Sequence, residues 1–329
     1  MKVEPLCPCK STMRFRFLSI ALPLLLLALV LTSCAANRPK RIALAEQFGL
    51  GYAPLDIMRA KGFLEAELES AGLQGYSIEW KRLVNTAAIR EAMLSGDVDV
   101  GFVAIPPFLI GRSNGMDWKI ISGISRAQIA LCSRAPGVQS IADLRSSHRI
   151  ALPQLGSIQH ILLKMELERL ALAPDALDAN IVVQSHPDGS NLFAQDADLL
   201  HLTAPPFVQQ NLALTDASSI LDGERAFGGP FTFVVGIAPR RFHDDAAAYA
   251  AVDRALRRAV AFMNEEPEES IATLLERYEY DEEFLRRLFR DKALQYSAEI
   301  EGLERFYEFM LRESMIEPLD LKDLIWEAP

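Results

Sequence analysis

The alternation of apolar and polar residues predicts short buried strands and amphipathic helices in regular succession. Short apolar runs bounded by glycine or proline recur through residues 41–237 and are typical of buried strands. Between them, apolar residues return every three or four positions, the spacing of a helix that packs one face against a sheet. From Asp244 onward the pattern is helical throughout. This succession predicts an α/β fold whose sheets are mostly parallel and flanked by helices.

The first unit, residues 41–63, combines a strand, a glycine-containing loop and a helix. Pro54 opens the helix, because a missing N–H is tolerated in a first helical turn, and Gly62 is placed to end it. Such a unit directs backbone N–H groups toward one point, and Gly49 and Gly51 let the backbone approach a small ligand there. The same pattern also fits the first strand–helix unit of any α/β domain.

The remaining elements are predicted from the same two patterns, which are short apolar runs for strands and apolar residues every three or four positions for helices. The predicted strands are residues 76–81, 98–103, 119–125, 128–132, 148–152, 181–183, 199–202 and 231–237, and the main predicted helices are 86–95, 157–172, 246–263, 265–278, 281–289 and 300–311.

The first 34 residues have the pattern of an export signal. Arg14 and Arg16 precede an apolar stretch at 17–31, which is shorter than the roughly 20 residues that a membrane helix needs. The stretch ends in the letters LTSC, whose cysteine is Cys34, and this resembles a bacterial lipobox. The sequence therefore predicts a protein anchored to the membrane by a lipidated Cys34, in the periplasm or at the cell surface.

The predicted boundaries are a lipoprotein signal peptide at 1–33 and a polar tether at 34–40. Either Met1 or Met13 fits the start, since residues 1–12 add nothing that a signal peptide needs. An uncleaved anchor is the alternative to a cleaved lipoprotein signal.

Composition and charge narrow the classes of function. The formal charge is −10 and no dense cluster of lysine and arginine occurs, which argues against a nucleic-acid partner. Cys7 and Cys9 lie in the leader, so Cys132 is the one thiol left after Cys34 is lipidated, and its apolar surroundings indicate a buried small hydrophobe. Neither the cysteines nor the histidines have metal-site spacing, so we expect no metal and no organic cofactor.

Six stretches of the chain match, in order, one family of proteins. They read GYAPLDIMRAKGFLEAEL, EAMLSGDVDVGFVAIPP, KIISGISRAQIALC, SIADLRSSHRIALPQLGS, DADLLHLTAPPFV and SMIEPLDLKDLI. By their order and spacing the chain resembles the extracytoplasmic solute-binding proteins of ABC importers, in the branch for nitrate, sulfonate, taurine and thiamine-precursor pyrimidines.

The resemblance implies a two-lobed periplasmic-binding-protein fold of type II. One lobe would comprise residues 41–126 plus 238–329, and the other residues 127–237. Such a protein closes like a hinge on its solute and hands it to a membrane permease that a separate ATPase subunit drives. We expect a monomer with a small-molecule solute.

Candidate ligand-binding residues follow from the predicted strand ends, which meet at one cleft. They are Phe48, Gly49, Tyr52, Asn85, Thr86, Ala104 and Ile105 in the first lobe, and Gly156, Ser157, Ser185 and Thr203 in the second. Asn85, Thr86 and Ser157 also fit a purely structural role as helix caps. Phe48 and Tyr52 also fit a place in the lobe core.

The same loops indicate the charge of the solute. They contain no lysine or arginine, but they contain Glu46 and Asp188. A carboxylate near the cleft opposes a bare oxyanion and suits an amine or a ring N–H donor, so Glu46 joins the candidate site residues. We therefore hypothesise that the solute is not a bare inorganic anion and that a neutral or amino-bearing heterocycle fits at least as well. A sulfonate or nitrate held by helix N-termini alone is the alternative.

Two rival functions remain at this point. Enzymes of menaquinone and thiamine-pyrimidine biosynthesis resemble these binding proteins, but no HExxH, GxSxG or P-loop motif occurs here. His160 and His186 lie where a ligand contact is conceivable, although a structural role fits each. The other rival is a sensory solute-binding protein that presents its solute to a separate receptor.

Overall fold

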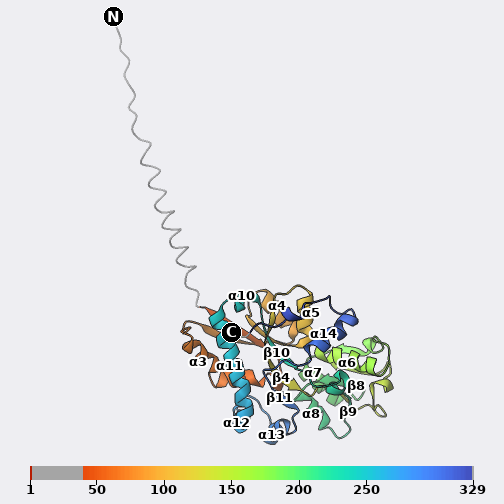
Figure 1. The fold of residues 1–329 in the computed structure, drawn as a ribbon. Coiled ribbons are helices and arrows are strands. Elements are labelled where there is room, and N and C mark those ends of the chain that lie inside the picture. Colours follow the sequence, from red (N-terminus) through yellow and green to blue (C-terminus); the bar gives the residue numbers. More distant parts are fainter. Residues whose placement is uncertain (2–39, 328–329) are drawn as a thin grey trace. The chain divides into compact units, whose positions relative to one another are not determined.

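Two separate β-sheets organise the described part of the chain, which comprises Met1 and residues 40–327 of the computed structural model (Figure 1). The predicted signal peptide after Met1, the lipidation site Cys34 and the tether up to residue 39 lie outside the described residues.

The first sheet has six strands in the order β11-β4-β10-β3-β1-β2. Their bounds are β1 Arg41–Glu46, β2 Ser77–Arg82, β3 Val100–Ala104, β4 Lys119–Ala127, β10 Val234–Ala238 and β11 Leu294–Tyr296. β3 and β10 are buried along their whole length, as their unbroken apolar runs predict for central strands. β1 is parallel to β3, whereas β10 is antiparallel to both β3 and β4.

The second sheet has five strands in the order β7-β6-β8-β5-β9. They are β5 Ala130–Ser133, β6 Arg149–Leu152, β7 Ile181–Val183, β8 Leu199–Thr203 and β9 Ser218–Asp222. β6 is parallel to β7 and β8, and β5 is antiparallel to β8 and β9.

The predicted α/β class is confirmed, but the expectation of mostly parallel sheets is wrong, because both sheets are mixed. The physical reason is the path of the chain between the sheets. It leaves the first sheet after β4 and returns as β10, which enters from the opposite direction and inserts between β3 and β4. The returning β10 is therefore antiparallel to both of its neighbours in the first sheet.

Helices cover both sheets. Those of the first half are α2 Ala53–Ala60, α3 Phe63–Ser70, α4 Thr86–Leu94 and α5 Ile105–Ser113; those beside the second sheet are α6 Ile158–Arg169, α7 His186–Gln195, α8 Phe207–Leu212 and α9 Gly223–Phe227. The C-terminal helices are α10 Arg240–His243, α11 Ala246–Glu265, α12 Pro267–Leu275, α13 Glu282–Arg290 and α14 Leu303–Arg312. Short 3-10 turns occur at Leu50–Tyr52, Ile141–Asp143, Asp178–Asn180 and Leu321–Asp323.

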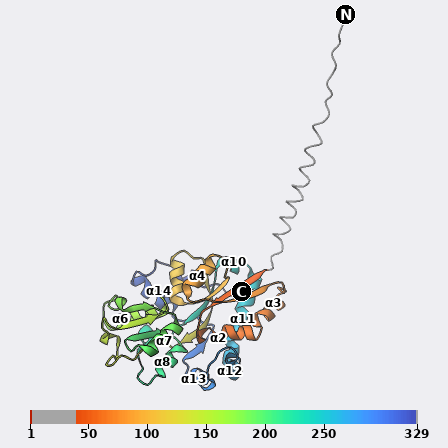
Figure 2. The ribbon, with the colours of Figure 1, turned by 180° about the vertical axis from the view of Figure 1, so that it is seen from behind.

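The C-terminal helices pack back onto the first sheet. α11 lies against α2 and α3, and α12 lies against α2. Both views show α11 and α3 on the side of the molecule away from α6 (Figures 1 and 2). α14 packs on α5, and α5 also contacts α6, so this corner joins the two halves.

The chain changes sheet between Ala127 and Ala130, and again between Asp222 and Val234. Two crossings of this kind are what a hinged pair of lobes requires. The predicted lobes, 41–126 plus 238–329 and 127–237, stay a prediction. No helix within the described residues has both the length and the apolar character that a membrane span requires.

Candidate solute-binding cleft

A small cavity lies where loops from the two sheets meet. Its wall on the first-sheet side comes from the loop after β1, the start of α4 and the start of α5; on the other side it comes from the loop after β6 and the starts of α6, α7 and α8. The free volume is about 30 Å³. That is room for one or two water molecules, far below the roughly 150 Å³ of a cavity that binds benzene. An organic solute can therefore enter only after the two halves move apart.

Wider grooves occur elsewhere, and one of about 720 Å³ lies between α12 and α13. Its rim includes Glu268, Glu283, Arg286 and Arg290, which pair with their neighbours in the surface. Its described lining residues belong to α11, α12, α13 and β11 with the residues beside them, and none comes from the second sheet. The smaller cavity is therefore the candidate site, because helix N-termini and strand ends from both halves meet there.

Gly49 shapes the first-sheet wall. Its φ of 119° is open to glycine and to few other residues, and it starts the turn that leads into α2. A side chain at Gly49 would point at the carbonyl oxygen of Pro205, 3.5 Å away in the opposite wall. The two walls therefore meet here through backbone.

Polar side chains on this wall bond to one another. The Gln47 amide donates to Thr86 Oγ1 at 3.2 Å. Burial raises the pKa of the Tyr52 hydroxyl far above its usual value, so it stays protonated and can donate. Phe48 is 43% exposed at the edge of the cavity.

The second-sheet wall begins at the N-terminus of α6. Ser157 caps this helix by accepting a hydrogen bond from the His160 N–H at 3.3 Å. His160 Nδ1 in turn accepts from the Gly156 N–H at 3.0 Å. Burial lowers the pKa of His160 to about 4, so this neutral imidazole holds the loop in place rather than contacting the cavity.

His186 lines the cavity from the start of α7. Its Nδ1 lies 2.7 Å from Thr203 Oγ1 at the end of β8, and its ring stacks on Phe207 with centroids 5.7 Å apart. Burial lowers the pKa of His186 to about 4, so the ring is neutral near pH 7. A neutral imidazole whose Nδ1 is already bonded can offer its other nitrogen to a ligand.

The cavity wall carries no formal charge. Among the described residues, those that line it include no lysine, arginine, aspartate or glutamate. Nor does any group of three or more His, Cys, Asp and Glu side chains in the described part of the chain form a metal site.

No protein-family model and no curated protein matches this sequence, whereas solved structures do. The alkanesulfonate-binding protein SsuA from Xanthomonas axonopodis pv. citri, bound to MOPS, aligns over 88% of this chain and 99% of its own, with a TM-score of 0.73 and 18% identity. The periplasmic aliphatic sulphonate binding protein SsuA from Escherichia coli aligns over 88% of this chain and 93% of its own, with a TM-score of 0.68 and 18% identity. The periplasmic nitrate-binding protein NrtA from Synechocystis PCC 6803 aligns over 86% of this chain and 84% of its own, with a TM-score of 0.68 and 14% identity.

The chain has the periplasmic-binding-protein fold. The resemblance inferred from the six sequence stretches is thereby confirmed at the level of the fold. The three proteins named above are described as binding proteins rather than enzymes.

In this binding-protein fold, half of the predicted site residues reach the wall of the cavity. They are Phe48, Gly49, Tyr52, Thr86, Ala104 and Ser157. Whether they bind a solute stays a prediction.

The other predicted positions lie behind the wall. Asn85 caps α4 by accepting from the Ala88 N–H at 3.0 Å, and Ser185 caps α7 in the same way through Asp188. Ile105 is fully buried in the core, and Thr203 supports His186. Gly156 faces Ile110 of α5 rather than the cavity.

Glu46 points away from the cavity. Its carboxylate is buried and pairs with Arg59 at 3.0 Å and Arg82 at 2.9 Å. Burial and the nearby Asp56 raise its pKa, and the two arginines oppose that shift. The inference that a free carboxylate at the cleft favours an amine therefore loses its basis.

Gly51 and His186, which the sequence marked as places where a ligand can approach, also line the cavity. The sequence analysis does not name the other wall residues, which are the small or apolar Pro107, Pro153, Ile158, Ala204 and Pro205, the polar Gln47, Gln154 and Gln159, and the aromatic Phe207 and Phe233. Most of them flank a predicted loop position by one or two residues, so the loops were identified but not the side chains that face inward.

Proposed function

We propose that this protein is the solute-binding component of an ABC importer, which captures a small organic solute between its two halves and delivers it to a permease. The observation that carries the proposal is the uncharged cavity at the meeting point of the two sheets, in a fold shared with proteins described as binding alkanesulfonate and nitrate. Convergent helix N-termini, a few polar groups and aromatic faces are the usual composition of a small-molecule site.

Capture follows from closure. The halves separate to admit the solute and then close, because aromatic and polar groups from both walls gain contacts only in the closed form. The small free volume of about 30 Å³ fits a nearly closed arrangement without solute.

The remaining parts of the proposal concern location and partners. Lipid on Cys34 would hold the protein at the membrane, in the periplasm or at the cell surface, beside the permease and its ATPase subunit. Replacing Cys34 by serine is expected to move the protein from the membrane fraction to the soluble fraction. Unchanged membrane association would contradict lipidation at Cys34.

Thermal unfolding of the purified full chain in detergent tests solute binding. The panel comprises alkanesulfonates, taurine, nitrate, bicarbonate, aminopyrimidines, other nucleobase-like rings and polyamines. A ligand at 100 times its Kd adds about 2.7 kcal/mol to the free energy of unfolding, which gives a clear upward shift in Tm. A hit that disappears when Phe207 is replaced by alanine supports the cleft as the site. A hit that survives this substitution places binding elsewhere.

A further inference from the structure

Two glutamines in the second-sheet wall are placed to offer their amides to a ligand in the cavity. Gln159 is only 2% exposed, lines the cavity and has no side-chain partner among the described residues. Gln154 lines the same cavity, and its buried Oε1 has no partner. A buried amide without partners is costly, so these side chains are suited to a ligand that supplies complementary groups. An amide offers donors and acceptors together.

The helix starts around the cavity are poor in the N–H groups that bind oxyanions. Pro106 and Pro107 occupy the second and third positions of α5, Pro187 the second position of α7, and Pro205 and Pro206 precede α8. Proline has no N–H to offer.

The helix starts of α4 and α6 also face the cavity, and each uses one N–H for a cap. Asn85 accepts from Ala88, and Ser157 accepts from His160. In the turn at Leu50–Tyr52 that leads into α2, the Tyr52 N–H bonds to the Gly49 carbonyl at 3.2 Å. An anion in this cavity would therefore find fewer backbone donors than uncapped, proline-free helix starts offer, and no side-chain cation among the described lining residues.

The charged groups beside the first-sheet wall are paired within the protein. The Arg82 guanidinium lies 5.8 Å from the ring centroid of Phe48, but it pairs with Glu46. Glu46 in turn pairs with two arginines and so gives no net attraction for a cationic solute. Transfer of an unpaired charge into a closed site is costly, and no charged side chain among the described lining residues offsets that cost for either sign.

Aromatic rings supply the apolar part of the wall. Phe48 and Phe233 belong to the first-sheet side, and Phe207 belongs to the other, where it stacks on His186. Rings on both sides of a closing cleft favour a flat solute.

We propose, building on the solute-binding function above, that this cleft selects an uncharged, flat solute that presents hydrogen-bond donors and acceptors to Gln154 and Gln159. The class comprises amides, lactams, ureas and uncharged nucleobase-like rings. It differs from the sulfonate and nitrate named for the structurally similar proteins.

Matched pairs of probes test the charge selectivity in the full chain. Calorimetry compares uracil with orotate, benzamide with benzoate, and benzenesulfonamide with benzenesulfonate, within a wider set of neutral amides and their anionic analogues. The neutral member is expected to bind at least tenfold more tightly in the pairs that bind. Equal or tighter binding of the anionic members overturns this inference but leaves solute binding standing. Silence across the whole set overturns both.

Substitutions then test the two glutamines. Gln159→Leu and Gln154→Leu are each expected to weaken the best neutral probe at least tenfold, because its polar groups lose their partners. Gln210→Leu, on the exposed face of α8, is the matched control and should leave affinity unchanged. Gln159→Lys should shift the preference toward the anionic member of a pair by at least tenfold. Unchanged affinity and preference in folded variants, verified by their Tm, would contradict the assignment.

Discussion

The two walls of the cleft face the same uncharged cavity but are supported in different ways. Behind the first-sheet wall stands a network of buried ion pairs. Behind the second-sheet wall stands a network of neutral hydrogen bonds. The comparison shows how a protein with many charged residues can present a cavity without formal charge.

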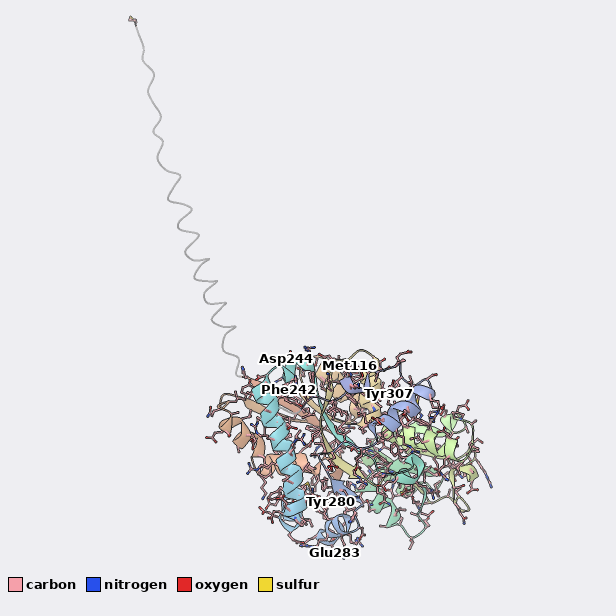
Figure 3. The ribbon with its side chains drawn as sticks, in the orientation of Figure 1. Met116, Phe242, Asp244, Tyr280, Glu283 and Tyr307 are labelled. Carbon is pink, nitrogen blue, oxygen red and sulfur yellow. The ribbon has the colours of Figure 1, made fainter. Side chains whose placement is uncertain are left out.

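The ion-pair network joins segments that are distant in sequence. Asp56 of α2 is buried, accepts from Arg277 at 3.0 Å and from the Tyr278 hydroxyl at 2.6 Å, and lies 3.7 Å from Arg82. Tyr280, labelled in Figure 3, stacks on Tyr278 with centroids 5.4 Å apart. The network therefore fastens the connection between α12 and α13 to the helix that follows β1.

The neutral network joins segments that are close in sequence. The amide of Asn211 bonds to His201 Nδ1 at 2.9 Å and accepts from Ser190 at 2.7 Å, while His186 bonds to Thr203. Burial lowers the pKa of His201 well below its usual value. Hydrogen bonds between uncharged groups suffice here, because α7, β8 and α8 already pack on one another.

The largest expected effect is on the charged side. Replacing Asp56 by alanine removes the one carboxylate that Arg277 and Tyr278 share, and we expect a loss of about 3 kcal/mol in the free energy of unfolding. Urea denaturation measures it. The matched control is Glu283→Ala, which breaks the exposed pair with Arg290 and should change stability by less than about 0.5 kcal/mol. Similar losses in the free energy of unfolding for both variants would contradict the prediction that the buried network stabilises the protein more than the exposed pair does.

The neutral side is expected to be the more sensitive to acid. Burial lowers the pKa of both His160 and His186 to about 4, against about 6.5 for an unfolded histidine. The unfolded state therefore binds more protons between pH 6.5 and 4, so stability falls as the pH drops through this range. Each of these histidines should contribute a loss of about 2 kcal/mol by pH 4.5. Glu46 on the charged side acts in the opposite direction, because its folded-state pKa is raised.

Urea denaturation of the wild type and of His160→Gln at pH 7 and pH 4.5 checks this. The wild type should lose about 2 kcal/mol more than the variant on acidification. Equal losses would mean that His160 already carries a proton in the folded protein.

The next effect concerns the point where the two walls meet. Gly49→Ala forces a side chain onto a backbone with φ of 119°, which should cost about 1–2 kcal/mol of stability. Since Gly49 faces the Pro205 carbonyl, we also expect weaker binding of any solute that requires full closure. Gly75→Ala is the control, because Gly75 has an ordinary φ and open space around it. If the Gly49→Ala variant is as stable as the Gly75→Ala control, a side chain at this φ does not strain the backbone and the prediction is wrong.

The sequence was sufficient for the fold class and for most loops around the cleft, but not for the strand directions. β9 (Ser218–Asp222) and β11 (Leu294–Tyr296) were missed, because one begins with two exposed serines and the other has only three residues. Both pair antiparallel to strands far away in the chain. Such pairing depends on long-range packing, which a local apolar pattern does not encode.

The site shows the same limit. Gln159 is the second residue of α6, and a polar residue at this position suggests a solvent-exposed face of the helix. In the structure, however, Gln159 lines the cavity. Glu46 ends an apolar strand next to the predicted loop, and nothing local reveals that Arg59 and Arg82, 13 and 36 positions later, neutralise it. Local patterns identified the loops, and only the packing decided which side chains face inward.

The smallest expected effect concerns an ion pair between the two halves. Arg312 of α14 pairs with Glu168 of α6 at 2.7 Å, and both side chains are about half exposed. Water and salt screen such a pair, so Arg312→Ala should cost about 0.2–1 kcal/mol, and the difference should shrink in high salt. Denaturation at low and high salt measures this, with Glu168→Ala expected to give the same loss. α14 also packs on α5. A loss well above 1 kcal/mol that persists in high salt would mean that the Arg312 side chain stabilises the contact between the two halves through packing rather than charge.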